Sequence, residues 1–176
     1  YMHEGTLFAV PFDLQRLEVT GPPAPILEGV VTTPGSGGAQ FSFSDIGNLV
    51  YVSGPSGVQN VSIYWMDHEG KFQPLRKIPG GYFNPAFSPD GNRLALDISD
   101  GKRNDIWVYE WERDTLTRLT LAGEGNSYPL WTPDGQRIVY SSLEKAGVSN
   151  LWWIRADGAG DAQRLTESKY IQNAGS

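Results

Sequence analysis

The stretch PAFSPDGNRLALDISDGKRNDIWVYEWERDTLTRLT, residues 85–120, decides the fold of this chain. Near its start, Ser-Pro-Asp-Gly at 88–91 combines a turn former, a proline whose ring presets φ, and a glycine that adopts positive φ without strain. This combination predicts a tight reversal of the backbone. We therefore expect two antiparallel strands, at 84–88 and 93–98, joined as a hairpin.

The second half of the stretch predicts two further strands. Residues 99–104 are polar and contain a glycine, which is typical of a loop, whereas 105–111 are aromatic and β-branched, which favours a strand. Arg113 and Asp114 then turn the chain into a fourth strand at 115–120. Four short antiparallel strands in about 44 residues have the size and layout of one β-propeller blade.

The same pattern occurs three times along the chain. FSDIGNLVYVS begins at Phe43, FSPDGNRLALD at Phe87 and WTPDGQRIVYS at Trp131, so the aromatic residue and the glycine behind it recur every 44 residues. Proline, aspartate and glycine shape such reversals, which gives the turn residues a structural reading. The residues read in this way are Pro89, Asp90, Gly91, Pro133, Asp134 and Gly135.

The repeats and the chain ends together predict an all-β fold, a partial β-propeller made of four-stranded antiparallel blades. Three blades are expected at 31–79, 80–123 and 124–168. Residues 1–30 supply the outer strands of an incomplete blade, and 169–176 begin a further inner strand. The chain would thus hold about 3.5–4 blades.

The expected strands differ in composition. Within the incomplete blade, strands are expected at 6–12 and 25–29. The third strands, such as 106–109 and 151–154, are apolar at every position, which indicates a sheet covered on both faces. The first and second strands are expected to be shorter and more mixed, because they border a narrow axial channel.

The composition supports many short strands and excludes several classes of protein. Among 176 residues, 21 glycines and 12 prolines leave little room for long helices. The formal net charge of −6, with no basic stripe, argues against nucleic acid as a partner. The chain has no cysteine and no apolar run of about 18 residues, so cysteine-ligated metals are excluded and no membrane insertion is predicted.

No constellation of residues in the sequence indicates catalysis. The two histidines, His3 and His68, lie in predicted turns, and a Gly-x-Ser-x-Gly nucleophile elbow is absent. Asp90 and Asp134 could be taken for paired carboxylates or calcium ligands, but aspartate in such a turn accepts hydrogen bonds from backbone N–H groups, which explains both more simply. We therefore predict no enzyme activity, no cofactor and no metal site.

A binding surface is expected where loops gather at one face of the ring. These loops connect each fourth strand to the next first strand, and each second strand to the third. They mix aromatic, amide and charged side chains, a composition that suits recognition and that solubility would also explain. The candidate binding residues are Tyr82, Asn84, Lys102, Arg103, Asn104, Asn126, Tyr128, Glu144 and Lys145.

The tryptophans are expected to serve packing. Of the six, Trp107, Trp131, Trp152 and Trp153 lie at core-strand positions, where a large ring packs between blades. Trp111 stands at the end of its strand and is expected to be exposed.

Segments 85–120 and 129–166 resemble the WD-like propeller repeat of TolB-type proteins. The opening, 1–30, more narrowly resembles the propeller that follows the kinase domain in some bacterial serine/threonine protein kinases. The first repeat departs from the pattern, because Ser-Asp-Ile-Gly at 44–47 lacks the proline. The resemblance implies a propeller fold and favours an extracytoplasmic, periplasmic location, while TolB-type propellers serve as binding platforms, sensor domains and peptidase caps.

Three functions are open on these grounds. The leading hypothesis is a non-catalytic module that binds a protein, a peptide or another ligand, in one form the sensor part of a bacterial receptor kinase. The second is the propeller cap of a serine peptidase whose catalytic domain lies outside this chain. The third is a purely structural, self-assembling propeller fragment.

The ends of the array predict self-association. Stacked repeats bury their apolar faces only against neighbours, and the terminal units here carry Phe8 and Trp153 rather than polar caps. Two copies could close a ring of about eight blades with a two-fold axis. We therefore expect a homodimer that completes a propeller, or else a fragment of a longer propeller.

Overall fold

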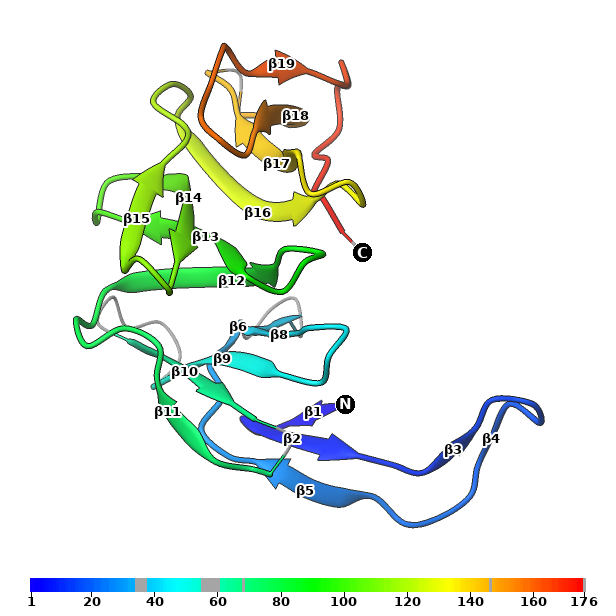
Figure 1. The fold of residues 1–176 in the computed structure, drawn as a ribbon. Helices are drawn as coiled ribbons and strands as arrows, with labels where there is room; N and C mark the ends of the chain where they lie inside the picture. The colour runs from blue at the N-terminus through cyan, green and yellow to red at the C-terminus, as the bar shows by residue number, and fades with distance from the viewer. Residues whose placement is uncertain (34–37, 55–60, 68, 146, 176) are drawn as a thin grey trace.

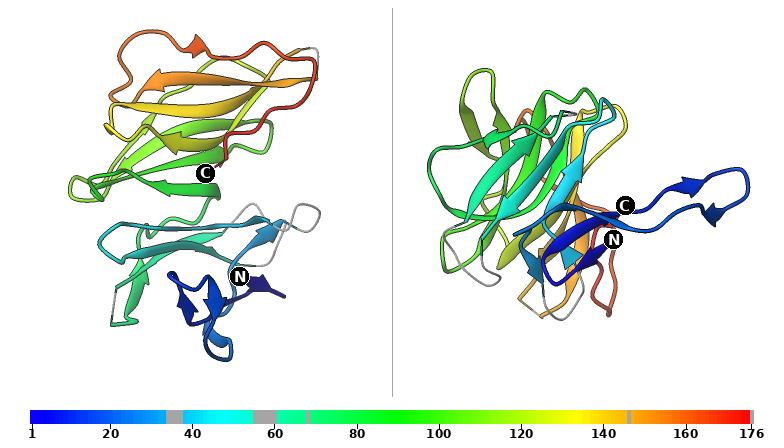
Figure 2. Two further views of the ribbon diagram at one scale, coloured as in Figure 1. Left: turned by 90° about the vertical axis from the view of Figure 1, so that its right-hand side faces the viewer. Right: turned by 90° about the horizontal axis from the view of Figure 1, so that it is seen from below.

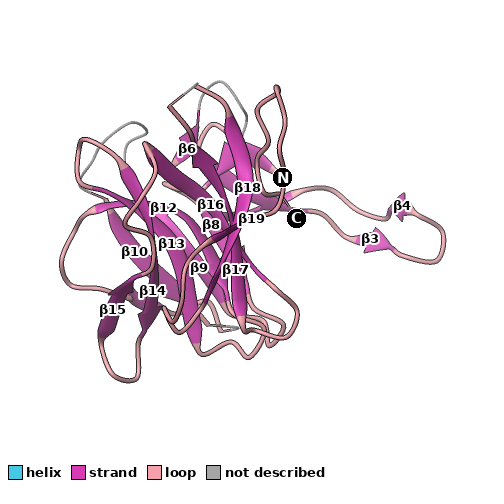
Figure 3. Cartoon of the chain, turned by 90° about the horizontal axis from the view of Figure 1, so that it is seen from above, coloured by secondary structure: helices cyan, strands magenta, loops and turns pink. Residues whose placement is uncertain are grey.

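The computed structural model describes residues 1–33, 38–54, 61–67, 69–145 and 147–175, and this part of the chain contains strands but no helix (Figure 3). Three four-stranded antiparallel sheets in the described part stack in chain order (Figure 1). Each sheet lies inside one of the predicted blades, whose outer boundaries stay a prediction. The arrangement confirms the all-β fold expected of a partial propeller.

The middle sheet is formed by the stretch quoted first. Its strands run in the order β12-β13-β14-β15. Neighbours pair antiparallel, with Leu94 of β13 opposite Tyr109 of β14. The strands are β12 (Gly81–Phe87), β13 (Arg93–Ser99), β14 (Asn104–Glu110) and β15 (Thr115–Arg118).

The sheets on either side repeat this order. The last sheet contains β16 (Gly125–Trp131), β17 (Arg137–Leu143), β18 (Ser149–Arg155) and β19 (Gln163–Arg164). The first sheet has shorter strands: β8 (Phe41–Phe43), β9 (Leu49–Ser53), β10 (Ser62–Met66) and β11 (Phe72–Pro74). A two-stranded ladder of β6 (Thr32–Thr33) and β7 (Gly38–Ala39) precedes β8.

The N-terminal sheet has three strands rather than the two expected. They are β1 (Met2–His3), β2 (Thr6–Ala9) and β5 (Ala24–Leu27), in the order β1-β2-β5. Glu4 and Gly5 have φ values of 48° and 78°, the backbone of a two-residue hairpin that matches strand twist, and this turn adds β1. Between β2 and β5, a hairpin of β3 (Phe12–Asp13) and β4 (Glu18–Val19) projects from the body (Figure 2).

The reversals of the repeat are built alike in the middle and last sheets. The backbone N–H of Asn92 donates to Asp90 Oδ1 at 3.2 Å, and that of Gln136 donates to Asp134 Oδ1 at 3.0 Å. Gly91 and Gly135 have φ values of 68° and 64°, which a residue with a side chain adopts only under strain.

Each pair of neighbouring sheets shares an apolar cluster. Val50, Ile63 and Leu94 lie in the cluster of nine buried residues between the first and middle sheets, and Ile106 and Ile138 in the cluster of eight between the middle and last sheets. The N-terminal sheet meets the first sheet through only four buried residues, which are Leu7, Val30, Leu49 and Tyr51.

The expected contrast between strands is wrong. The first and second strands of the middle sheet are seven residues long, as is the third, and four successive residues of β13, from Leu94 to Asp97, are at most 1% exposed. Because blades radiate from an axis, neighbouring sheets lie closest at their inner strands and diverge outward. The inner strands are therefore the better covered ones.

Two expectations for the tryptophans need correction. Trp111 is half-buried rather than exposed, with its ring 5.8 Å from that of Trp65 and 6.1 Å from that of Phe87. Trp107 is also half-buried, and the guanidinium of Arg118 covers its ring at 5.9 Å. The outward divergence of the sheets explains both positions.

The C-terminal segment follows the last sheet without forming a strand, unlike the inner strand expected at 169–176. The backbone N–H of Gln172 donates to the Ser149 carbonyl at 2.9 Å, and that of Ala174 donates to Ser141 Oγ at 2.9 Å. These isolated bonds hold the segment against the sheet (Figure 2).

The described residues include no helix long and apolar enough to cross a membrane.

Candidate functional site

The candidate site lies on one face of the stack, which we call the loop face. It is formed by the loops from β11 to β12, β13 to β14, β15 to β16 and β17 to β18. Because the strands alternate in direction, the tight reversals at 88–92, 111–114 and 132–136 lie at the opposite ends, on what we call the turn face. Most candidate binding residues belong to these loops or to the strand ends beside them, whereas Asn84 and Tyr128 are the middle residues of β12 and β16.

The inner part of the loop face is built around a buried carboxylate. Asp97 is 0% exposed, and it accepts hydrogen bonds from Asn84 Nδ2 at 2.8 Å and from Asn104 Nδ2 at 3.0 Å. Burial raises the pKa of Asp97 to about 6, although the bonds from the two asparagines act in the opposite direction. Hydrogen bonds from the Tyr128 backbone and the Ser127 side chain act in the same direction as those of the asparagines, so neutral donors on two neighbouring sheets surround this carboxylate.

Two of the residues that bond to Asp97, Asn84 and Tyr128, lie at a repeated irregularity of the backbone. Asn84 and Tyr128 have φ values of 48° and 59° and lie 44 residues apart. Both sit where the pairing register shifts, between Phe83 and Ala86 in β12 and between Ser127 and Leu130 in β16. A bulge at the same repeat position therefore re-aims the inner strands of two sheets.

A second carboxylate fastens the middle sheet to the last. Asp105 accepts a hydrogen bond from Thr120 Oγ1 at 3.0 Å and one from Asn126 Nδ2 at 3.3 Å. It also pairs with Arg103 Nε at 3.1 Å and, at close range, with Arg118. Arg103 and Asn126, expected to be free for binding, are instead both bonded to Asp105, and the bond from Asn126 joins the last sheet to the middle one.

The loop between these sheets is anchored by the same residues. Arg103 Nη2 donates to the Leu121 carbonyl at 3.2 Å, and Asn126 Nδ2 donates to the Ala122 carbonyl at 2.8 Å. The loop from β15 to β16 is thus held at fixed points by side chains beneath it. A surface whose loops are fixed in this way loses little conformational entropy on binding.

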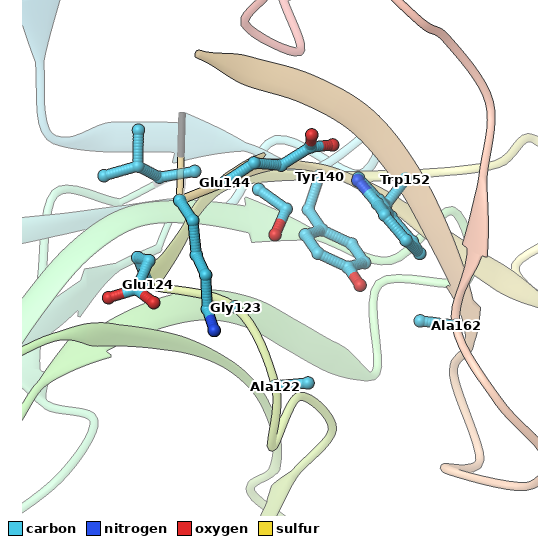
Figure 4. A pocket seen from close by; sticks show the side chains of 10 residues that line it. Ala122, Gly123, Glu124, Tyr140, Glu144, Trp152 and Ala162 are labelled. Carbon is cyan, nitrogen blue, oxygen red and sulfur yellow. The ribbon is translucent and has the colours of Figure 1, made fainter. Parts of the chain in front are cut away.

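A hollow of about 300 Å³ opens on the loop face between the middle and last sheets (Figure 4). The rings of Tyr140 and Trp152, which face each other across the β17–β18 pairing, form its wall, and Glu144 lies at its rim. The lining residues are Ala122, Gly123, Glu124, Tyr140, Ser142, Leu143, Glu144, Lys145, Trp152 and Ala162. A mostly apolar hollow with a few polar groups is the usual form of a ligand pocket.

The candidate binding residues thus have different positions. Lys102 and Lys145 are exposed, and Tyr128 is 41% exposed. Tyr82 is only 3% exposed, and its hydroxyl donates to the Ile78 carbonyl at 2.8 Å. Asn126 is 1% exposed, so the expectation that Tyr82 and Asn126 lie on an open binding surface is wrong.

Sequence reasoning missed four residues of the loop face. They are the buried Asp97 and three residues that line the hollow, Glu124, Tyr140 and Trp152. Asp97 did carry a signal, because an aspartate interrupts the apolar run Leu-Ala-Leu-Asp-Ile at 94–98. The pocket residues carried no such signal, because the hollow forms only where strand residues of the last sheet lie opposite the loop at 122–124.

The described residues show no grouping suited to a metal. No three His, Cys, Asp or Glu side chains among them lie close enough together to hold an ion. His3 is exposed in β1, whereas His68 lies outside the described residues.

Comparison with known proteins agrees with the fold. The family model described as the TolB beta propeller domain matches residues 39–175. The Tol-Pal system protein TolB of Anaeromyxobacter dehalogenans is 36% identical over 89 residues, which are 50% of this chain and 20% of that protein. The peptidase YuxL of Bacillus subtilis, itself named as uncharacterized, is 28% identical over 93 residues, which are 49% of this chain and 14% of that protein.

A solved structure gives the same result at the level of fold. TolB from Acinetobacter baumannii superposes with a TM-score of 0.68 at 19% identity, over 96% of this chain and 42% of that one. The chain therefore spans less than half the length of each of these three proteins.

Proposed function

Because the chain belongs to the TolB beta propeller domain family, we propose that it is a non-catalytic module that binds a protein or peptide through its loop face. One observation carries the proposal: the loop face combines loops fixed from below with the exposed side chains of Lys102, Tyr128 and Lys145. Loops positioned by a rigid scaffold are a common site of recognition.

The loop face is the better of the two faces for binding. Its hollow exposes mainly apolar groups beside a few polar ones, which suits a buried contact. The turn face is made of reversals whose side chains are engaged with their own backbone, such as Asp90 and Asp134. We therefore assign recognition to the loop face and a structural role to the reversals.

Photo-crosslinking on the two faces tests this assignment. The crosslinker p-benzoylphenylalanine replaces Lys102 or Tyr128 on the loop face, and Arg113 or Gln136 on the turn face, in the full-length protein in its host. We expect discrete adducts, identified by mass spectrometry, from the first pair only. Equal labelling from both pairs contradicts the assignment of the face.

We place the chain outside the cytoplasm. The support is its family and its relative named for the Tol-Pal system. Fusion of the full-length protein to alkaline phosphatase, which is active only outside the cytoplasm, tests this location. An inactive fusion of normal abundance argues against it.

A second function is favoured by the match to the peptidase YuxL. In this reading the propeller is the cap of a serine peptidase whose catalytic domain lies elsewhere in the protein. The resemblance of 1–30 to kinase-associated propellers supports a third form, the sensor of a receptor kinase. The flanking coding sequence separates them, because an α/β-hydrolase downstream favours the cap, a kinase upstream favours the sensor, and an isolated reading frame favours a structural piece.

Assembly into a closed ring is part of the proposal. The outer face of the last sheet holds Val139 and Trp153, both partly exposed, and the N-terminal sheet leaves Ile26 48% exposed. Two copies would cover these faces as a homodimer, with each chain completing the propeller of the other. Light scattering on the purified chain tests this, and a folded monomer of 19.4 kDa at micromolar concentration rules out obligate closure.

A further inference from the structure

Two polar atoms in or behind the wall of the loop-face hollow have no partner within the described part of the chain. Trp152 Nε1 is buried without a hydrogen bond, and so is Asn126 Oδ1. Exchanging the oxygen and nitrogen of the Asn126 amide would not give the oxygen a partner without loss, because Nδ2 already donates to two acceptors, the Ala122 carbonyl and Asp105 Oδ1. A buried donor and a buried acceptor are thus both unsatisfied beside one pocket, which is unusual in a native protein.

The unpaired acceptor lies directly behind the pocket wall. A Cβ atom on Gly123 would stand 3.2 Å from Asn126 Oδ1 and 2.9 Å from Ser142 Oγ. Gly123 and Ser142 both line the hollow, and Gly123 has a φ of 93°, which disfavours any side chain there. The wall at this point is therefore thin, and polar groups stand close to the space it encloses.

The same wall carries two aromatic rings. Tyr140 and Trp152 are direct partners in the β17–β18 pairing and point to the same side of the sheet (Figure 4). The Tyr140 hydroxyl forms no hydrogen bond with the described residues. Burial raises the pKa of Tyr140 to about 12, so the hydroxyl stays a neutral donor and acceptor at physiological pH.

The charges at the rim balance one another. Glu144 is paired with Arg164 at 3.1 Å, while Glu124 and Lys145 carry opposite charges at the mouth. A cationic or anionic guest would therefore find no net countercharge to offset its desolvation. The guest that fits is a neutral one.

From these observations we propose that the hollow receives a tyrosine side chain of the partner, an inference that rests on the proposed binding function. A volume of about 300 Å³ suits one aromatic side chain with its backbone. Its ring would pack against Tyr140 and Trp152, and its phenol group would form hydrogen bonds with the polar groups of the wall. An aliphatic side chain could fill the same space but would leave those groups unpaired.

Titration of the purified chain with capped amino acids tests the proposal. The probes are N-acetyl-tyrosinamide and N-acetyl-phenylalaninamide, and the readout is the indole N–H signal of Trp152 in ¹H–¹⁵N spectra, identified among six tryptophans by Trp152→Phe. We expect a saturable shift for the tyrosine probe, with Kd on the order of 1 mM. The phenylalanine probe should bind about 5-fold more weakly, because it lacks one hydrogen bond.

A matched pair of variants locates the binding. Ala122 is exposed and lines the hollow, so Ala122→Trp should fill it and weaken the tyrosine probe by about tenfold or more. Leu121, 73% exposed, does not line the hollow, so Leu121→Trp adds the same ring beside it and should leave Kd within about 2-fold. Equal melting temperatures for both variants show that the fold is intact.

Three results overturn the inference: no saturable shift at Trp152, equal affinity for the two probes, or equal weakening by the two variants. Its failure is separable from failure of the proposed function. Crosslinks from Lys102, which does not line the hollow, combined with no probe binding would reject the tyrosine anchor and keep the binding face. Probe binding without any loop-face adduct would keep the pocket's chemistry but reject its use by a partner, and the inference with it.

Discussion

Asp105 in the middle sheet and Asn150 in the last sheet occupy the same position of the repeat, but they fasten their surroundings differently. In both sheets the backbone N–H of the next residue donates at 2.9 Å to a threonine hydroxyl, from Ile106 to Thr120 and from Leu151 to Thr166. The scaffold is therefore equivalent. The residue placed on it is a charged carboxylate in one sheet and a neutral amide in the other.

The arginine partners follow this difference. Arg118 reaches inward to Asp105, whose side chain is 5% exposed, whereas the equivalent Arg164 pairs with Glu144, whose side chain is 31% exposed. Asn150 is neutral itself: the backbone N–H of Ser168 donates to its Oδ1 at 2.8 Å, and its Nδ2 donates weakly to Glu144 Oε1 at 3.5 Å. The comparison teaches that one repeat can hold an ion pair at two depths, and only the deeper one should matter for stability.

Replacing Asp105 and Asn150 by alanine is the strongest test of this difference between the two sheets. Asp105→Ala leaves Arg103 and Arg118 without their carboxylate, so we expect a loss of about 3 kcal/mol in the free energy of unfolding. Asn150→Ala removes the hydrogen bonds of an uncharged amide and should cost about 1–2 kcal/mol. Urea denaturation of both variants measures the difference, and equal losses contradict a special role for the buried charge.

The pH dependence of stability should distinguish a second equivalent pair, Asp97 and Ser141. The pKa of Asp97 is raised to about 6 in the folded chain, above its value in the unfolded one, so the native state binds the proton more tightly. Stability should therefore fall as the pH rises from about 4 to about 6, by on the order of 2 kcal/mol.

Asp97→Asn should remove this slope. The new amide nitrogen would face the side-chain donor of Asn84 or Asn104, which lowers stability at every pH. The readout is therefore the slope of stability against pH and not the absolute stability. Ser141→Ala serves as the control, since no charge is lost at that position. A slope that persists in Asp97→Asn assigns the titration to another group.

The two reversals should be equally sensitive to a side chain. An alanine Cβ at Gly91 would lie 3.9 Å from Ile46 Cδ1, and one at Gly135 would lie 3.6 Å from Arg93 Nη2, so space is available at both. The cost is backbone strain at positive φ, about 1 kcal/mol for each alanine variant. Thermal unfolding should give matching losses; a clear difference would show that the two turns are not equivalent.

The smallest effect is expected at the shallow ion pair. Arg164→Ala should lower stability by at most about 0.5 kcal/mol, because the Glu144–Arg164 pair is partly solvated and pays side-chain entropy. Arg118→Ala should cost clearly more at every salt concentration. Urea melts at low and high salt check this, and a loss at Arg164 as large as that at Arg118 would remove the distinction by depth.

The sequence predicted what depends on short segments. The reversal at 88–91 and its copy at 132–135 both contain proline, aspartate and glycine, so the hairpins and their spacing could be predicted from the sequence. The three blades followed from that spacing, and the family match over 39–175 agrees with them.

What could not be predicted depends on which surfaces meet. Tyr82 and Asn126 look like loop residues in the sequence, but the former binds its own loop and the latter lies between two sheets. The β1 strand was missed because Glu4-Gly5 is a hairpin signal too close to the N-terminus to show a pattern on both sides. The hollow was missed because Tyr140 and Trp152 become a wall only when the loop at 122–124 lies opposite.

The unequal clusters between sheets have a mechanical consequence. Stretched by its two ends, the chain carries the same tension through every sheet boundary, and the boundary with the least buried surface separates first. The N-terminal sheet is held by four buried residues, against nine and eight at the inner boundaries. Force–extension traces should therefore begin with a small rupture that releases residues 1–30, followed by larger ruptures as the remaining sheets come apart.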